Sequence, residues 1–107
     1  MSYDPNFEKF ISSVKKDFNP LKLFLFGSRA WDANSKSSDY DVLVLSDKKS
    51  KSNQQAYEIL SQCHPGHISI DLLVRSPEEI QDRLKKEDPF FKKIIDKGIV
   101  LYERDSR

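Results

Sequence analysis

The feature that most constrains the fold is the alternation of short apolar runs with segments that carry a helical repeat. Apolar runs of strand length cover residues 21–26, 39–45 and 68–74, and a shorter one covers 99–102. Apolar side chains at helical spacing precede the first run, over residues 5–18, and recur between the later runs. This alternation predicts one α/β or α+β domain, in which helices flank a central sheet of about four strands.

Several of the predicted helices have terminal signals. Ser76 followed by Glu79 forms a capping box, and Asp88 before Pro89 is typical of a helix start. Gly98 is expected to end the helix that begins there. The lysine- and serine-rich segment 46–53 is expected to be a loop.

Length and charge limit the functions that the chain can have. Its 107 residues are predicted to form one domain, with no second domain for substrate binding. The 18 basic and 17 acidic residues nearly cancel, so neither nucleic acid nor an anionic membrane is an expected direct ligand. No apolar run is long enough to span a membrane, the start lacks a signal-peptide pattern, and Cys63 is the single cysteine. A soluble, cytoplasmic protein is the expectation.

Two carboxylates open the second strand-like run. Asp39 and Asp41 should point to the same side of a strand, roughly 6.6 to 6.8 Å apart, because side chains alternate. Asp71 interrupts the third run in the same way. A carboxylate inside an apolar strand is costly unless it is solvated, paired or bound to a metal. If the two strands are neighbours, the three carboxylates converge, and such oxygen ligands suit Mg²⁺ or Mn²⁺.

Gly27-Ser28 supplies a complementary feature after the first strand. A glycine turn that leads into a helix exposes backbone N–H groups, which suits phosphate. Phosphate binding, paired carboxylates and a divalent ion together indicate phosphoryl or nucleotidyl transfer. Each feature alone has a structural explanation as a tight turn or a surface acid. Their order on consecutive predicted strands favours a functional site.

A second cluster of possible ligands has a simpler explanation. Cys63, His64 and His67 lie close together in the sequence and could suggest a zinc site. A second pair of ligands at zinc-finger spacing is missing, and a turn between a helix and a strand accounts for Pro65 and Gly66. A turn is therefore the preferred interpretation. Nucleophilic catalysis by serine or cysteine is less favoured still, because neither histidine has an evident acidic partner.

The motifs resemble those of a known superfamily. Gly27-Ser28, followed after ten residues by Asp39-x-Asp41 and later by Asp71 within a strand, is similar to the nucleotidyltransferase superfamily that includes DNA polymerase beta. The short chain, its leading helix and its ending over residues 97–103 resemble the minimal nucleotidyltransferases (MNT) in particular. The similarity covers about residues 5–103.

The resemblance implies a mixed sheet and a role for each motif. Gly27 and Ser28 would hold the triphosphate of ATP, and Asp39 and Asp41 would bind two magnesium ions. Asp71 would bind one of these ions and help to deprotonate the attacking hydroxyl. Arg29 is a candidate phosphate ligand, with an ordinary surface arginine as the alternative.

The resemblance also implies a partner. Stand-alone minimal nucleotidyltransferases accompany a small helical HEPN protein, often as the antitoxin of a toxin–antitoxin pair, and some transfer AMP from ATP to a tyrosine of the toxin. The expected function is thus magnesium-dependent AMPylation of a partner toxin. Two alternatives stay open: a binding antitoxin that acts by complex formation, and a nucleotidyltransferase for a small molecule or an RNA end.

Overall fold

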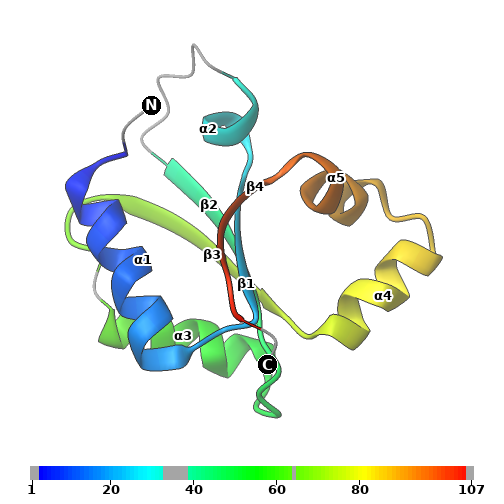
Figure 1. The fold of residues 1–107 in the computed structure, drawn as a ribbon, viewed down its shortest axis with the longest axis horizontal. Helices are drawn as coiled ribbons and strands as arrows, with labels where there is room; N and C mark the ends of the chain where they lie inside the picture. Colours follow the sequence, from blue (N-terminus) through cyan, green and yellow to red (C-terminus); the bar gives the residue numbers. More distant parts are fainter. Residues whose placement is uncertain (1–2, 33–38, 64, 106–107) are drawn as a thin grey trace.

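The computed structural model describes residues 3–32, 39–63 and 65–105 (Figure 1). The described helices are α1 (Pro5–Phe18), α2 (Ser28–Trp31), α3 (Ser52–Gln62), α4 (Pro77–Lys85) and α5 (Pro89–Lys97). The described strands are β1 (Lys22–Phe26), β2 (Asp39–Leu45), β3 (Ser69–Arg75) and β4 (Ile99–Glu103). The predicted α/β fold with a central four-stranded sheet is therefore confirmed. None of the helices in the described ranges is long and apolar enough to cross a lipid bilayer.

The sheet is mixed, as the resemblance implied. Its strands lie in the order β3-β2-β1-β4. β1 is antiparallel to both of its neighbours, β2 and β4, whereas β2 and β3 are parallel. A parallel pair needs a crossover connection, and α3 lies within the segment that supplies it. This crossover makes β2 and β3 neighbours, which was the condition for bringing their carboxylates together.

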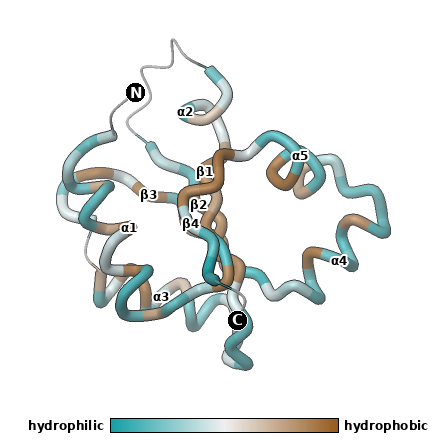
Figure 2. The backbone as a smooth tube through the Cα atoms, viewed as in Figure 1, coloured by the Kyte–Doolittle hydropathy of each residue, from teal (hydrophilic) through white to brown (hydrophobic). Residues whose placement is uncertain are grey.

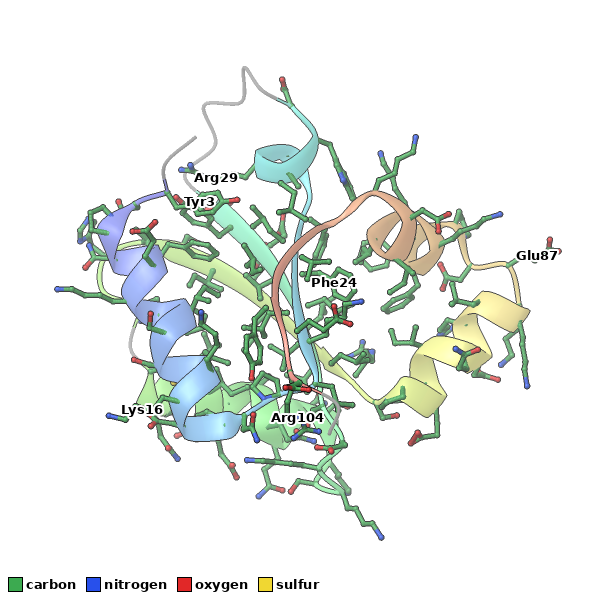
Figure 3. The ribbon with its side chains drawn as sticks, in the orientation of Figure 1. Tyr3, Lys16, Phe24, Arg29, Glu87 and Arg104 are labelled. Carbon is green, nitrogen blue, oxygen red and sulfur yellow. The ribbon has the colours of Figure 1, made fainter. Side chains whose placement is uncertain are left out.

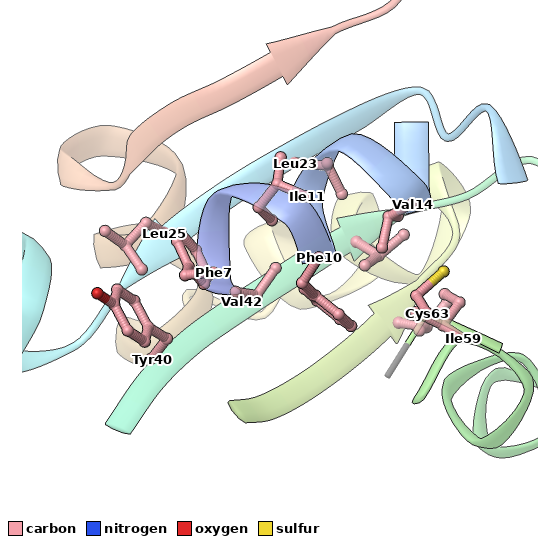
Figure 4. Close-up of a cluster of buried hydrophobic side chains, with 12 residues drawn as sticks. Phe7, Phe10, Ile11, Val14, Leu23, Leu25, Tyr40, Val42, Ile59 and Cys63 are labelled. Carbon is pink, nitrogen blue, oxygen red and sulfur yellow. The ribbon is translucent and has the colours of Figure 1, made fainter. Parts of the chain in front are cut away.

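Helices cover both faces of the sheet. α1 and α3 lie on one side, and α4 and α5 lie on the other (Figure 1). Each strand contributes alternate side chains to the two sides. In β1, Leu23 and Leu25 join the buried cluster under α1 and α3 (Figure 4), while Phe24 and Phe26 join the cluster under α4 and α5. Figure 2 shows the resulting pattern, with apolar strands at the centre and hydrophilic segments mainly outside.

One predicted boundary is wrong by two residues. The segment 46–53 was expected to be a loop, but α3 already begins at Ser52. The buried Gln55 side chain holds this region together, because it accepts a hydrogen bond from Ser46 Oγ (2.7 Å) and donates one to the backbone oxygen of Ser50 (2.6 Å). A polar side chain that satisfies its hydrogen bonds inside the protein is not apparent from an apolar pattern.

Candidate active site

The parallel pairing of β2 and β3 places two of the predicted carboxylates side by side. Asp41 is the register partner of Asp71, and Asp39 is the partner of Ser69. Asp41 is half-buried, and Asp39 and Asp71 are exposed. Their strand neighbours Tyr40 and Val42 belong to the cluster under α1, so the carboxylates face the side that α4 and α5 cover.

The carboxylates interact electrostatically. Burial raises the pKa of Asp41, and a hydrogen bond with the adjacent Asp71 carboxyl raises it further. The negative charges of Asp71 and Asp39 act in the same direction. Two neighbouring carboxyl groups share a proton, or a cation lies between them if both are ionised. This donor set fits a hard divalent cation such as Mg²⁺.

The three carboxylates are not yet arranged as a complete metal site. In the ranges that the structure describes, no group of three or more Asp, Glu, His or Cys side chains is placed so that it could hold a metal ion. Asp41 and Asp71 form the close pair, and Asp39 acts on Asp41 through its charge. Asp41 and Asp71 would therefore be the main ligands of a divalent ion. Asp39, which lies on β2 with Asp41, would be an additional ligand.

Gly27 joins the turn after β1 to the carboxylates. Its φ of 78° and ψ of −163° suit glycine, and its backbone oxygen accepts hydrogen bonds from Ala30 and Trp31 of α2. A Cβ atom at this position would collide with the Asp41 carboxylate. The close approach of the turn to Asp41 thus requires a residue without a side chain. The structure brings these two predicted motifs into contact.

The two residues after Gly27 differ in their positions. Ser28 is the exposed first residue of α2. Arg29 turns away from the carboxylates, because its Cζ atom lies 4.1 Å from the ring centroid of Tyr40, on the other side of the sheet. Figure 3 shows it near Tyr3, which also packs against Tyr40. In this arrangement the Arg29 guanidinium packs on Tyr40, whose side chain belongs to the cluster under α1 and α3.

Gly27, Asp41 and Asp71 line one cleft, whose volume is about 510 Å³. This volume is typical of ligand-binding clefts. The other lining residues are apolar: Phe26, Trp31, Leu72, Leu73 and Phe90. The sequence patterns did not indicate these residues as part of the site. No local signal distinguishes Phe90 from the adjacent Phe91, yet Phe91 is buried and Phe90 lines the cleft.

A larger hollow of about 760 Å³ lies elsewhere, between the segment 47–53 and the start of α4. Its lining is mostly charged or polar, including Lys49, Lys51 and Arg83. Neither this segment nor α4 contributes to the carboxylate pair. We therefore assign the candidate active site to the smaller cleft, where carboxylates, a glycine turn and an apolar wall meet.

A comparison with protein families identifies the class of protein. The family model described as "Polymerase beta, Nucleotidyltransferase" matches residues 8–107, which is nearly the whole chain. The chain belongs to this family. Comparisons of this nucleotidyltransferase with curated proteins and with solved structures gave no match.

Of the cysteine and histidines considered for zinc in this nucleotidyltransferase, the structure describes Cys63 and His67. Cys63 is buried in the cluster under α1, and burial raises the pKa of its thiol. His67 is exposed, and its Nδ1 lies 3.3 Å from Nδ2 of Asn6. His64 lies outside the described residues.

Proposed function

We propose that this nucleotidyltransferase transfers AMP from ATP to a hydroxyl group of a partner protein and depends on Mg²⁺. The main support is the contact between the glycine turn and the carboxylate pair. Gly27 abuts Asp41, and Asp41 pairs with Asp71 in the same cleft. A phosphate bound at the turn would lie next to oxygen ligands for a cation, which is what nucleotidyl transfer requires.

Each residue has a defined role in the proposed reaction. Asp39, Asp41 and Asp71 would hold two Mg²⁺ or Mn²⁺ ions, which would neutralise the charge that develops on the phosphates. Gly27 and Ser28 would bind the triphosphate through backbone N–H groups, and the serine hydroxyl would assist them. Arg29 would have to leave the Tyr40 ring to reach a phosphate.

Asp71 would also accept the proton of the acceptor hydroxyl. The freed oxygen forms a bond to the α-phosphorus of ATP, and the bond from that phosphorus to the bridging oxygen breaks. Pyrophosphate then leaves with the electrons of the broken bond. Within the Asp41–Asp71 pair, Asp71 is exposed and Asp41 is half-buried, so Asp71 is the member of the pair that an incoming hydroxyl can reach more easily.

The proposed acceptor is a tyrosine of a small helical HEPN toxin, so that the protein acts as an antitoxin. This part of the proposal follows the resemblance to minimal nucleotidyltransferases. The acceptor tyrosine would have to reach the cleft, which is lined by residues of β1, α2, β2, β3 and α5 and by Gly27 in the turn between β1 and α2.

The decisive experiment combines the protein, Mg²⁺, labelled ATP and the candidate partner, and locates the label by mass spectrometry. Asp71→Asn should reduce transfer by about 100-fold to 10,000-fold, because it impairs both metal binding and proton removal. Asp96→Asn changes an exposed aspartate of α5 that does not line the cleft, and it should leave transfer unchanged.

A cellular assay then separates catalysis from simple binding. If Asp71→Asn abolishes transfer and also abolishes protection from the toxin, covalent modification is the working function. If the variant still binds and still protects cells, the antitoxin acts by complex formation. Label on a small molecule or an RNA end, with none on the partner protein, would contradict the proposed acceptor.

A further inference from the structure

The apolar wall of the cleft has no role in the reaction described so far. Phe90, at the start of α5, lines the cleft together with Phe26 and Trp31. Its side chain is 47% exposed, although it borders a cluster of buried aromatic and aliphatic residues. An aromatic ring left half-exposed inside a cleft, next to polar groups that converge there, is typical of a ligand-binding surface.

Packing holds the rings of this wall in place. The Phe90 ring makes edge-to-face contacts with Phe26 (5.6 Å between centroids) and Phe91 (5.1 Å). The Trp31 ring lies 6.4 Å from Phe26, and its indole N–H donates a hydrogen bond to the backbone oxygen of Lys97 (2.8 Å). A ligand that packs on this wall would therefore meet a preorganised surface, which lowers the entropy cost of binding.

The wall suits an uncharged, flat group better than a phosphate. The backbone N–H groups of Phe90 and Phe91, which could otherwise bind an anion, already donate to the Asp88 carboxylate. Asp88 also brings a negative charge to this end of α5. Phosphates are instead expected at Gly27 and the carboxylate pair. The parts of a nucleotide left for the wall are its ribose and its base, and only the base is flat.

We propose that Phe90, supported by Phe26 and Trp31, is the stacking platform for the nucleobase of the bound nucleoside triphosphate. This inference rests on the proposed nucleotidyltransferase function and extends it to substrate recognition. Bases stack on aromatic side chains whatever their hydrogen-bonding edge, because each base has a π-face.

The lining also determines how selective this platform is. Among the described lining residues, Asp41 and Asp71 are the only ones with a charged side chain, and the Trp31 N–H is already bonded. The platform therefore recognises the area of the base rather than its edge. ATP and GTP should bind with similar affinity, and UTP should bind more weakly because its ring is smaller.

Calorimetric titration of the full chain with magnesium and either a nucleotide or inorganic tripolyphosphate tests this inference. Phe90→Ala should weaken ATP and GTP binding by about tenfold, because it removes the ring on which the base stacks. It should leave tripolyphosphate binding unchanged, because tripolyphosphate has no base. Phe90→Leu keeps apolar volume against Phe26 and Phe91 and serves as a folding control. Phe90→Leu should bind ATP as weakly as Phe90→Ala does, because leucine has no aromatic ring. Phe90→Tyr should bind ATP with the affinity of the unmodified protein.

The matched control is Tyr57→Ala, which removes an exposed aromatic ring of α3 that does not line the cleft. It should bind every ligand like the unmodified protein. Unchanged ATP affinity in Phe90→Ala would overturn the platform, and so would an equal loss of ATP and tripolyphosphate binding. If the unmodified protein binds neither ATP nor tripolyphosphate, the proposed function itself fails, and the platform fails with it.

Discussion

At the scale of single residues, Gly27 connects the two chemical parts of the site. Its positive φ and its contact with Asp41 both exclude a side chain. Gly66 provides a comparison, because it also has a positive φ (74°) but faces only Asn6, whose nearest atom would lie 3.5 Å from an added Cβ. Both glycines have a positive φ, which a residue with a side chain rarely adopts. Only Gly27 also lies against a carboxylate of the cleft.

We expect Gly66→Ala to lower the free energy of unfolding by about 1–2 kcal/mol, the usual cost of a left-handed conformation for a residue with a side chain. Gly27→Ala should cost at least as much and should also displace the Asp41 carboxylate. Magnesium-dependent ATP binding should therefore be lost in Gly27→Ala and retained in Gly66→Ala. Urea unfolding and calorimetry measure the two effects, and normal ATP binding by Gly27→Ala would contradict this account of the turn.

At the scale of secondary structure, the start of α4 is fixed by its capping box. Ser76 Oγ accepts a hydrogen bond from the Glu79 backbone N–H (3.1 Å), and Glu79 Oε1 accepts one from the Ser76 backbone N–H (2.8 Å). Glu79 also accepts a hydrogen bond from Ser52 Oγ at the start of α3 (3.2 Å). The Ser76 backbone N–H makes the largest contribution to a lowered pKa of Glu79.

This lowered pKa determines a pH dependence of stability. Because the pKa of Glu79 in the folded protein lies below its unfolded value of 4.5, the stabilisation is complete above that pH. It is lost as the pH falls through the folded pKa. Glu79→Gln should flatten the acid side of the stability curve, as measured by urea unfolding from neutral to acid pH.

Two further variants test the assignment to the capping box. Ser76→Ala should cost about 1 kcal/mol at neutral pH, because it removes the side-chain acceptor of the box. Glu78→Gln removes a neighbouring carboxylate that takes no part in the box, and so controls for the change in net charge. If Glu78→Gln and Glu79→Gln change the pH dependence of the free energy of unfolding equally at acid pH, general charge repulsion causes this dependence and the capping box does not.

At the scale of the whole molecule, the strand order concentrates stability at the centre of the sheet. β1 and β2 are hydrogen-bonded on both sides, while β3 and β4 lie at the edges. The central strands also contribute the most buried side chains, among them Leu23, Leu25 and Leu43, each 0% exposed. Asp41 and the glycine turn start from these central strands, whereas Asp71 lies on the edge strand β3. The central part of the sheet therefore supports most of the candidate site.

Native-state hydrogen exchange should follow this order. Backbone amides of β1 and β2 are expected to exchange most slowly, through global unfolding. Amides of β4 and of the short helix α2 should exchange faster, through local opening. Nuclear magnetic resonance at increasing denaturant concentration measures the opening free energy of each amide. Protection of β4 equal to that of β1 would show that the sheet opens as one unit.

The sequence by itself was sufficient for features that depend on neighbouring residues. The helix at Pro5–Phe18, the strand at Asp39–Leu45 and the capping box at Ser76 agree with their predictions. Apolar periodicity and capping act over one or two turns of chain, so a sequence records them directly. The motifs at Gly27 and at Asp39-x-Asp41 were recognisable for the same reason.

Only the tertiary structure decided how distant segments meet. The sequence predicted that the carboxylates would converge if their strands were neighbours, but the crossover through α3 and the register set Asp41 beside Asp71. Arg29 follows the glycine turn directly, yet it packs on Tyr40 across the sheet. Phe90 reaches the cleft because α5 packs against β1, through contacts between residues far apart in the chain. Such contacts depend on how helices pack on a sheet, and local sequence patterns do not encode this packing.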